Sequence, residues 1–261
     1  MASQPAATTR TAGEPAWRQT ELSDPHAHGD KARKVRTMFA AIARSYDLNN
    51  RVHSLWMDQL WRRYAVRVAG VKPGDVVVDV ACGTGDLTEA FAKRSPAKRV
   101  IGIDYTPQML DLARVKQTKK GIDTGRVEYR EGDAMNLDLP DNSADVLSIA
   151  FGIRNVREPE VAFGEFARVL RPGGRLVVLE FDTPRLAPVR IFNDFYSGWV
   201  MPRTATLISR DKSGAYRYLP KSVQTFATRD RMIEMIEGAD FETPRVRSLS
   251  MGICACYRAV R

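Results

Sequence analysis

The stretch Val76-Val-Val-Asp-Val-Ala-Cys-Gly-Thr-Gly-Asp86 decides the fold. It begins with a short apolar run typical of a buried strand, and two glycines separate that run from a helical pattern. In an open α/β sheet, ligands bind beside such turns at the carboxyl ends of the strands. Gly83 and Gly85 let the backbone approach a ligand closely, although any tight strand-to-helix turn can use glycine. The stretch therefore predicts a strand, a candidate ligand-binding turn and a helix.

The sequence beyond this stretch continues the alternation of strand and helix. We expect strands at 75–81, 99–104, 126–130, 144–150 and 174–181, and helices at 86–94, 107–120 and 159–170. A helix at 229–238 precedes two closing strands, 243–250 and 252–259, joined at Met251-Gly252. The alternation predicts a parallel sheet with helices on both faces, and the tight final connection predicts an antiparallel last strand. The fold class is therefore α/β, with a seven-stranded, mostly parallel sheet.

Three segments stand outside this alternation. Residues 31–69 carry apolar side chains at helical spacing, which predicts an N-terminal helical cap interrupted by a turn at Asp47-Leu-Asn-Asn50. Residues 182–230 form an insertion that is rich in aromatic and basic residues and longer than an ordinary connection. Residues 1–30 lack apolar periodicity, so we expect a disordered tail followed by a single domain over 31–261.

Composition excludes several classes of protein. The chain has 261 residues, of which 44% are hydrophobic and 27% charged, as in an ordinary soluble domain rather than a collagen-like or disulfide-scaffold chain. Its net charge of +9 favours an anionic partner, which a nucleic acid, an acidic membrane surface or a small anionic substrate would each satisfy. Between Arg185 and Arg231, nine Lys and Arg stand against three Asp.

The three cysteines indicate a reducing compartment. They cannot form a paired framework, and the first 30 residues lack the apolar core of a secretory signal, so we expect a cytoplasmic protein. The Cys254-x-Cys256 pair lies in an apolar run with no second pair. We interpret it as buried thiols rather than a metal site, and we expect no metal.

Two further strand ends carry residues suited to an adenosyl group. Asp104 ends the second strand, where a carboxylate can accept hydrogen bonds from a ribose diol. Asp133 follows the third strand and can accept the exocyclic amine of adenine, while Ala134 offers a backbone N–H to the ring. Taken singly, Asp133 is an ordinary turn residue. The glycine loop and these strand ends together favour an adenosyl ligand.

The charges near the loop distinguish between two adenosyl ligands. A nicotinamide dinucleotide fingerprint needs a third glycine, but Thr88 occupies that position, and Asp86 would repel a pyrophosphate. The sulfonium and ammonium cations of S-adenosylmethionine suit carboxylates at Asp79 and Asp86. The alternative for Asp86 is a first-turn charge that interacts favourably with the helix dipole.

At the fourth strand the sequence resembles the ubiquinone/menaquinone biosynthesis C-methyltransferases. The matching stretches are Met38-Phe39 with Ser45-Tyr-Asp47, Asp79 to Asp86, Phe151-Gly-Ile-Arg-Asn-Val156, Glu165 to Gly174 with Leu179-Glu-Phe181, and Tyr216-Arg-Tyr-Leu-Pro-Lys-Ser222. The glycine loop and the Arg-Pro-Gly-Gly turn are common to many methyltransferases, whereas the Phe151 and Tyr216 motifs are far more restrictive. The resemblance covers most of residues 35 to 257 and implies the Rossmann-like class I methyltransferase fold.

The resemblance implies methyl transfer from S-adenosylmethionine to a ring carbon of a prenylated quinol, most closely demethylmenaquinol. It assigns cofactor contacts to Thr84, Asp104, Asp133 and Ala134. Family members vary at two positions, with Asn in place of Asp133 or Ser in place of Ala150. The cofactor set that we expect is Asp79, Gly83, Thr84, Gly85, Asp104, Asp133 and Ala134.

Methylating a ring carbon needs an electron-rich ring and removal of a hydroxyl proton. Arg154 and Asn155 follow the fourth strand, where a guanidinium can stabilise a developing phenolate, directly or through a water, and the amide can donate or accept beside it. We therefore expect Arg154 and Asn155 to be catalytic. The alternative is a buried arginine paired with Glu180 and an asparagine turn.

Two other segments are candidates for binding the acceptor. Tyr46 and Asp47 either shape its pocket or serve only in packing. In the insertion, Phe192, Phe195, Tyr196 and Trp199 recur at helical spacing, which is typical either of core or of an aromatic cover that rests on an anionic membrane surface. The second interpretation predicts a protein peripheral to the inner face of the membrane.

Other functions fit the sequence less well. A nucleic-acid amine methyltransferase would carry an Asn/Asp-Pro-Pro-aromatic motif where Phe151-Gly-Ile-Arg-Asn155 stands, so we expect no nucleic-acid partner. Methylation of a ubiquinol precursor, of another phenolic ring, and a non-catalytic role in a quinone-synthesis assembly stay open. The sequence leaves the oligomeric state open as well.

Overall fold

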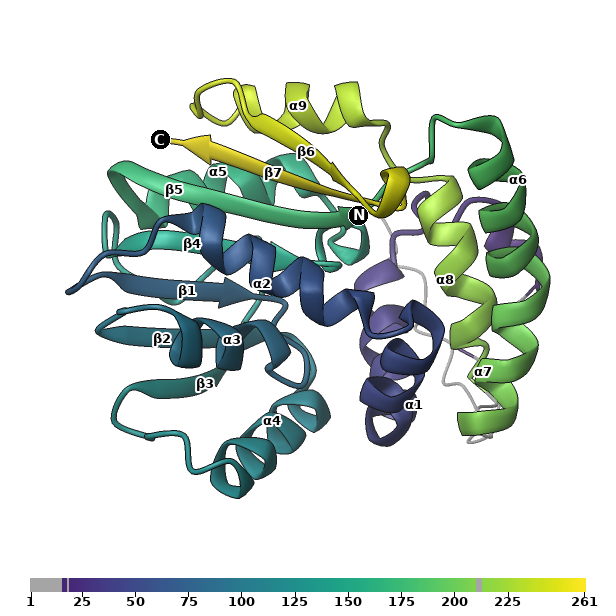
Figure 1. The fold of residues 1–261 in the computed structure, drawn as a ribbon, viewed down its shortest axis with the longest axis horizontal. Coiled ribbons are helices and arrows are strands. Elements are labelled where there is room, and N and C mark those ends of the chain that lie inside the picture. The colour runs from purple at the N-terminus through teal and green to yellow at the C-terminus, as the bar shows by residue number, and fades with distance from the viewer. Residues whose placement is uncertain (1–15, 18, 210–212) are drawn as a thin grey trace, which may run out of the picture.

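The computed structural model describes residues 16–17, 19–209 and 213–261. Its centre is one seven-stranded sheet in the order β3-β2-β1-β4-β5-β7-β6 (Figure 1). The strands are β1 (Val76–Val80), β2 (Arg99–Asp104), β3 (Val127–Glu131), β4 (Ala144–Ala150), β5 (Leu170–Phe181), β6 (Arg245–Leu249) and β7 (Cys254–Val260). Only β7 runs antiparallel to its neighbours, β5 and β6. The predicted mostly parallel sheet with an antiparallel last strand is confirmed.

Helices cover both faces of the sheet, as predicted. The helices of this layer are α2 (Met57–Ala69), α3 (Asp86–Arg94), α4 (Pro107–Lys119), α5 (Pro159–Val169) and α9 (Arg229–Glu237). Apolar side chains of α2, α3 and α4 pack on one face of the sheet, and those of α5 and α9 pack on the other. Because β1 is buried on both sides, its apolar residues form a continuous run rather than an alternating pattern.

A second group of helices lies beyond the carboxyl ends of the parallel strands, on the right of Figure 1. It comprises α1 (Lys31–Ser54), α6 (Ala187–Phe195), the π-helical turn η3 (Tyr196–Val200), α7 (Met201–Ser209) and α8 (Ala215–Gln224). Short 3-10 turns complete the fold at η1 (Gln19–Ser23), η2 (Ile153–Asn155) and η4 (Ser250–Gly252). The cap and the insertion are thus neighbours in space, although more than 100 residues separate them in the sequence.

The predicted turn at Asp47-Leu-Asn-Asn50 is wrong. These residues lie inside α1, and the helix breaks later, at Leu55 and Trp56, which both have positive φ angles. The polar side chains of residues 47–50, which suggested a turn, instead contact residues far away in the sequence: the Asn49 amide donates to the Tyr216 hydroxyl at 2.8 Å. The tertiary contacts therefore outweigh the local preference of Asp and Asn for turns.

The packed part of the chain begins earlier than predicted. We expected a disordered tail to residue 30, but Trp17 is 1% exposed and η1 packs against α8. The Trp17 ring stacks on Tyr218 with centroids 4.7 Å apart. A single tryptophan has no periodicity to reveal it, which is why the sequence pattern missed this contact. The remainder of the predicted tail, residues 1–15 and 18, lies outside the described residues.

The cysteines behave as predicted for packed thiols. Cys254 and Cys256 are free and buried on the same face of β7, among the side chains that cover one face of the sheet. Burial raises the pKa of the Cys256 thiol to about 12. Among the described residues, no group of three or more His, Cys, Asp and Glu is placed to hold a metal ion.

Candidate functional site

The main pocket lies between the carboxyl ends of β1, β2, β3 and β4 and the inner side of α1. The pocket is partly open, and about 820 Å³ of empty space lies within it and its mouth. Its lining residues include Ala32, Val35, Phe39 and Tyr46 from α1, Val80, Ala81 and Gly83 from β1 and its loop, Asp104 to Thr106, Gly132 to Met135, and Ala150 to Gly152 with Asn155 to Arg157. Strand ends thus form one wall and the cap forms the other.

Asp104 occupies the end of the pocket beside the glycine loop. One carboxylate oxygen accepts from the backbone N–H of Gly83 and the other from that of Thr106, each at 2.8 Å. Burial raises the pKa of this carboxyl, although both hydrogen bonds oppose that rise. The two N–H groups fix the orientation of the carboxylate at the pocket wall, where its remaining lone pairs can accept hydrogen bonds from hydroxyl groups.

Asp133 and Ala134 line the same end from the turn after β3. The Asp133 carboxylate accepts from the Met135 backbone N–H at 2.9 Å, so it closes its own turn while facing the pocket. The turn interpretation of Asp133 is confirmed, and the residue also borders the pocket; its contact with adenine stays a prediction. The structure thus brings Gly83, Asp104, Asp133 and Ala134 together, as the strand ends predicted.

The two glycines of the loop serve different purposes. Gly83 lines the pocket with a φ of +56°, and a Cβ there would meet no atom within 4 Å. Gly85 does not line it; a Cβ there would overlap the Tyr129 hydroxyl. Gly83 therefore leaves open space at the pocket wall, whereas Gly85 is required by packing against β3.

Asp79 is buried beneath the loop rather than exposed to the pocket. Its two oxygens accept from the hydroxyls of Thr88 at 2.6 Å and Ser148 at 2.8 Å. Burial raises its pKa to about 6, against the effect of these hydrogen bonds. The Asp79 carboxylate supports the loop from below, and it lies outside the pocket lining to which a ligand cation would bind.

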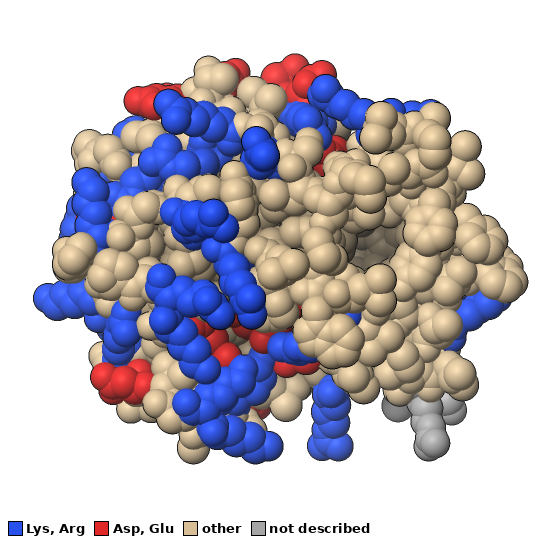
Figure 2. Space-filling view, in the orientation of Figure 1, with Lys and Arg blue, Asp and Glu red and all other residues tan. Residues whose placement is uncertain are grey.

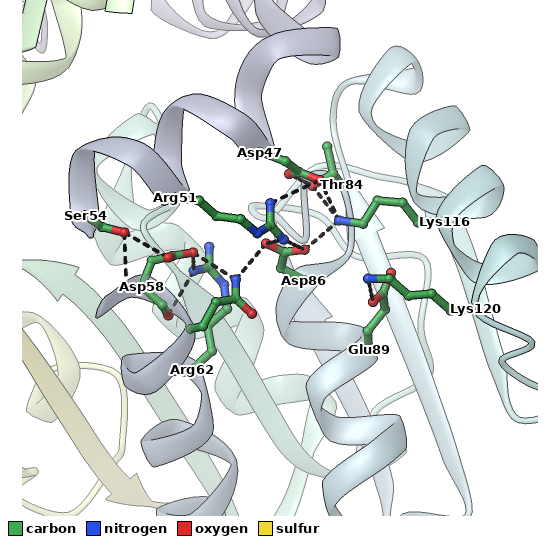
Figure 3. Close-up of polar contacts among 11 residues, drawn as sticks. Asp47, Arg51, Ser54, Asp58, Arg62, Thr84, Asp86, Glu89, Lys116 and Lys120 are labelled. Atoms are coloured by element: carbon green, nitrogen blue, oxygen red, sulfur yellow. Dashed lines mark hydrogen bonds and ion pairs between the residues drawn. The ribbon is translucent and has the colours of Figure 1, made fainter. Parts of the chain in front are cut away.

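Thr84 belongs to a polar cluster that joins the cap to the core (Figure 3). Its hydroxyl donates to Asp47 of α1 at 2.5 Å, and Lys116 of α4 bridges Asp47 at 2.7 Å and Asp86 at 2.5 Å. Arg51 of α1 also pairs with Asp86 at 3.1 Å. These cations, together with Arg62, hold the pKa of the Asp86 carboxyl well below its usual range. The cluster fastens α1 over the glycine loop, and neither Thr84 nor Asp86 lines the pocket.

The opposite end of the pocket is formed by η2 and the cap. Asn155 lines it; its carbonyl oxygen accepts from the Tyr218 hydroxyl at 2.9 Å, and its amide donates to Phe151 O at 3.3 Å. Tyr46 lines it from α1, with its ring edge-on to Phe39. The expectation that Tyr46 helps to shape this pocket agrees with its position. Asp47 instead points to the polar cluster that joins α1 to the core.

Arg154 does not reach the pocket surface. Its guanidinium is 3% exposed, donates to Glu180 and to Phe151 O at 2.7 Å each, and contacts the Ser222 hydroxyl at 3.3 Å. This geometry corresponds to the alternative considered for the sequence, a buried arginine paired with Glu180. Arg154 therefore supports the backbone beside Asn155 rather than facing a reacting ring.

Sequence reasoning missed several lining residues. Val35, Tyr105, Thr106 and Met109 border the pocket but carry no motif of their own. Tyr105 and Thr106 directly follow Asp104, so the strand end that revealed the aspartate could also have indicated them. Nothing local distinguishes the pocket-facing residues of α1 from its core residues.

The fold and the site define the class of protein. This strand order, with carboxylates at the ends of β2 and β3 beside a glycine loop, is that of the class I S-adenosylmethionine-dependent methyltransferases. The structure is similar to a methyltransferase of this kind from Thermotoga maritima (TM-score 0.60, 22% identity, 87% of this chain and 99% of that chain). A second, from Aquifex aeolicus, gives a TM-score of 0.55 at 20% identity over 76% of this chain and 88% of that one.

Sequence similarity shows the family. Residues 27–261 match the ubiE/COQ5 methyltransferase family, and the chain belongs to it. It is 39% identical to the ubiquinone/menaquinone biosynthesis C-methyltransferase UbiE of Teredinibacter turnerae, over 89% of this chain and 93% of that protein. It is 42% identical to the demethylmenaquinone methyltransferase of Deinococcus radiodurans, over 87% and 92%. The methyl donor of this family is S-adenosylmethionine, as predicted.

No helix within the described parts of the chain has both the length and the apolar character needed to cross a membrane.

Proposed function

We propose that the protein transfers a methyl group from S-adenosylmethionine to a ring carbon of demethylmenaquinol, giving menaquinol. The observation that carries this proposal is a single pocket with two different ends. Asp104 and Asp133 give one end the acceptors that an adenosyl group needs, while Tyr46, Phe151 and Asn155 give the other end aromatic walls and one amide. The 42% identity to the Deinococcus demethylmenaquinone methyltransferase supports the choice of acceptor.

The residues of the cofactor end fit S-adenosylmethionine. When bound, this molecule supplies an electrophilic methyl group. Asp104 would accept the ribose hydroxyls, Asp133 and Ala134 would contact the adenine edge, and Gly83 would leave room for the chain between them. Thr84, Gly85 and Asp79 would act indirectly, since each maintains the loop from outside the pocket.

The residues of the acceptor end would orient the ring. Asn155 is held by Tyr218 and by Phe151 O, so its amide group has a fixed direction at the pocket wall. We assign Asn155 to contact with a ring hydroxyl, and Arg154 to positioning the η2 backbone through its bonds to Phe151 and Glu180. Fixed orientation of the ring carbon lowers the entropic part of the barrier.

A direct assay separates the open alternatives. Purified protein is incubated with S-adenosylmethionine and either a short-chain demethylmenaquinol or a benzoquinol precursor of ubiquinol, kept reduced, and products are analysed by mass spectrometry. We expect a product heavier by one methylene unit from demethylmenaquinol. Methylation of the benzoquinol alone would refute the choice of acceptor. Cofactor binding by calorimetry without methylation of either would favour a non-catalytic role.

We further propose that α6, η3 and α7 dock on an anionic membrane surface, at the cytoplasmic face where a lipid acceptor is available. Phe192, Phe195 and Trp199 are more than half exposed, and η3 and α6 bury none of their residues. Figure 2 shows this part of the surface as a broad uncharged area around a hollow, beside a face dense in Lys and Arg. Arg203 lies over the Trp199 ring at 4.4 Å, which places a cation at the edge of the aromatic surface.

Vesicle co-sedimentation tests this docking. Wild-type protein should bind phosphatidylglycerol-containing vesicles in a salt-sensitive manner, and the double variant Phe195→Ser/Trp199→Ser should lose most of that binding. Val161→Ser removes an exposed apolar side chain from α5, on a face of the sheet, and serves as the matched control. Equal binding by wild type and the double variant would refute the assignment of the surface.

A further inference from the structure

Lys31 is a buried lysine next to the acceptor end of the pocket. It is the first residue of α1 and is 1% exposed. Its ammonium group donates to Val156 O at 2.6 Å, and within the described chain no carboxylate lies at ion-pair distance from it. Val156, which accepts this hydrogen bond, and Ala32, which follows Lys31 in the chain, both line the pocket. A buried ammonium group whose partner is a backbone carbonyl costs folding free energy.

Burial and the charge of Arg154 both disfavour the positive charge on Lys31. Arg154 is close enough to repel it and Asp24, an exposed residue, attracts it, while burial is the main reason why the pKa of Lys31 falls to about 8. His26 donates from its ring to Ser222 O, and burial together with Lys31 lowers its pKa. Glu180 is already paired with Arg154. One buried positive charge is therefore left without a buried counter-charge.

The pocket as a whole is polarised in consequence. Its charged lining residues are Asp104 and Asp133 at the cofactor end and Arg157 at the acceptor end. Arg157 pairs with Glu158 at the surface, so its charge is largely satisfied there. The uncompensated charge at the acceptor end comes from Lys31, beneath Val156. A positive potential in a site of low dielectric favours an anionic ligand.

We propose that Lys31 is a positioning residue that makes the acceptor end bind a ring hydroxyl in its ionised form. This inference rests on the proposed function and extends it by naming the charge state of the acceptor. In the ionisation the O–H bond breaks, its electron pair stays on oxygen, and the proton leaves to water at the open mouth of the pocket. The resulting phenolate pushes electron density onto the ring carbon that is to be methylated.

The test measures ionisation rather than turnover. The probe is 4-methoxy-1-naphthol, a quinol with one hydroxyl blocked, and its naphtholate absorption is titrated against pH in the presence of excess protein. We expect the bound naphthol to ionise at lower pH than the free naphthol. Lys31→Met should shift the bound value upward by about one unit, a tenfold change in the ionisation constant, and Lys31→Arg should restore most of the effect.

Lys34→Met is the matched control. Like Lys31, Lys34 is buried on α1 and does not line the pocket, but unlike Lys31 it is paired with carboxylates, those of Glu21 and Asp30. It should leave the naphthol titration unchanged. Identical titrations in wild type and Lys31→Met, or no binding of the naphthol across its ionisation range, would overturn the proposal. A shifted titration without methylation of demethylmenaquinol would retain this inference and refute the proposed function.

Discussion

Replacing Lys31 by methionine is expected to stabilise the protein at neutral pH. The folded protein lowers the pKa of Lys31 from its ordinary 10.5 to about 8. At about 1.36 kcal/mol per pH unit, the charged form costs about 3 kcal/mol of folding free energy once the pH is below the folded value. Loss of the hydrogen bond to Val156 O offsets about 1 kcal/mol of the gain. The net expectation is about 2 kcal/mol in favour of the variant.

The pH dependence gives this prediction its sign. The pKa of Lys31 is lower in the folded protein than in the unfolded chain. The burial of Lys31 therefore costs no charge-related folding free energy above pH 10.5, and that cost develops as the pH falls through about 8. The advantage of Lys31→Met should therefore be largest near neutral pH and shrink as the pH rises. Urea unfolding followed by circular dichroism at several pH values measures the difference. A variant that is less stable than wild type at neutral pH, or a difference independent of pH, would refute the reasoning.

Three further predictions test the site. Gly85→Ala should cost about 2–4 kcal/mol in urea unfolding, because its Cβ meets the Tyr129 ring and its φ is +84°; unchanged stability would contradict the packing role. Lys116→Met should weaken cofactor binding measured by calorimetry. In a double-mutant cycle with Asp86→Asn, the two binding free-energy changes should be coupled by about 1 kcal/mol or more, because the two side chains form an ion pair. Additive changes would contradict the role of this ion pair in fastening α1 over the loop. Asp79→Asn should be less stable than wild type, and the difference in unfolding free energy should shrink as the pH rises from 3.8 through about 6. The reason is that the raised pKa of the Asp79 carboxyl stabilises the wild-type protein only at acid pH. A difference that does not change with pH would contradict that pKa.

The sheet and the cofactor end could be predicted from local sequence. Each strand of the parallel sheet is a short apolar run, and the carboxyl ends of adjacent parallel strands meet at one edge. That is why Gly83, Asp104 and Asp133, which are distant in sequence, could be placed together before the structure was known. The antiparallel last strand followed from the tight turn at Met251-Gly252.

The environment of individual side chains could not be predicted in this way. Arg154 is satisfied by Glu180 and Ser222, residues 26 and 68 positions further along the chain. The motif placed the arginine beside the pocket correctly, but the direction of its side chain depends on where those partners fold. The same holds for Thr84, whose hydroxyl donates to Asp47 of α1.

The insertion shows a second limit of periodicity. Phe192, Phe195 and Trp199 recur at helical spacing, which is equally typical of a core helix and of an apolar surface. The structure exposes all three. Periodicity shows that a helix has an apolar face, but only the arrangement of the other elements shows whether anything covers it.

The stacking of Trp17 on Tyr218 has a practical consequence. Tyr218 in turn holds the carbonyl oxygen of Asn155, so a segment ahead of the cap braces the acceptor end through only two side chains. Among the described residues, no hydrogen bond, ion pair or ring contact joins residues 16–17 and 19–23 to the glycine loop or to Asp104 and Asp133. Trimming the chain to start at Lys31, or placing an affinity tag close to Trp17, is therefore expected to leave cofactor affinity intact while degrading discrimination among acceptors. Assays of acceptor preference call for protein that keeps this segment.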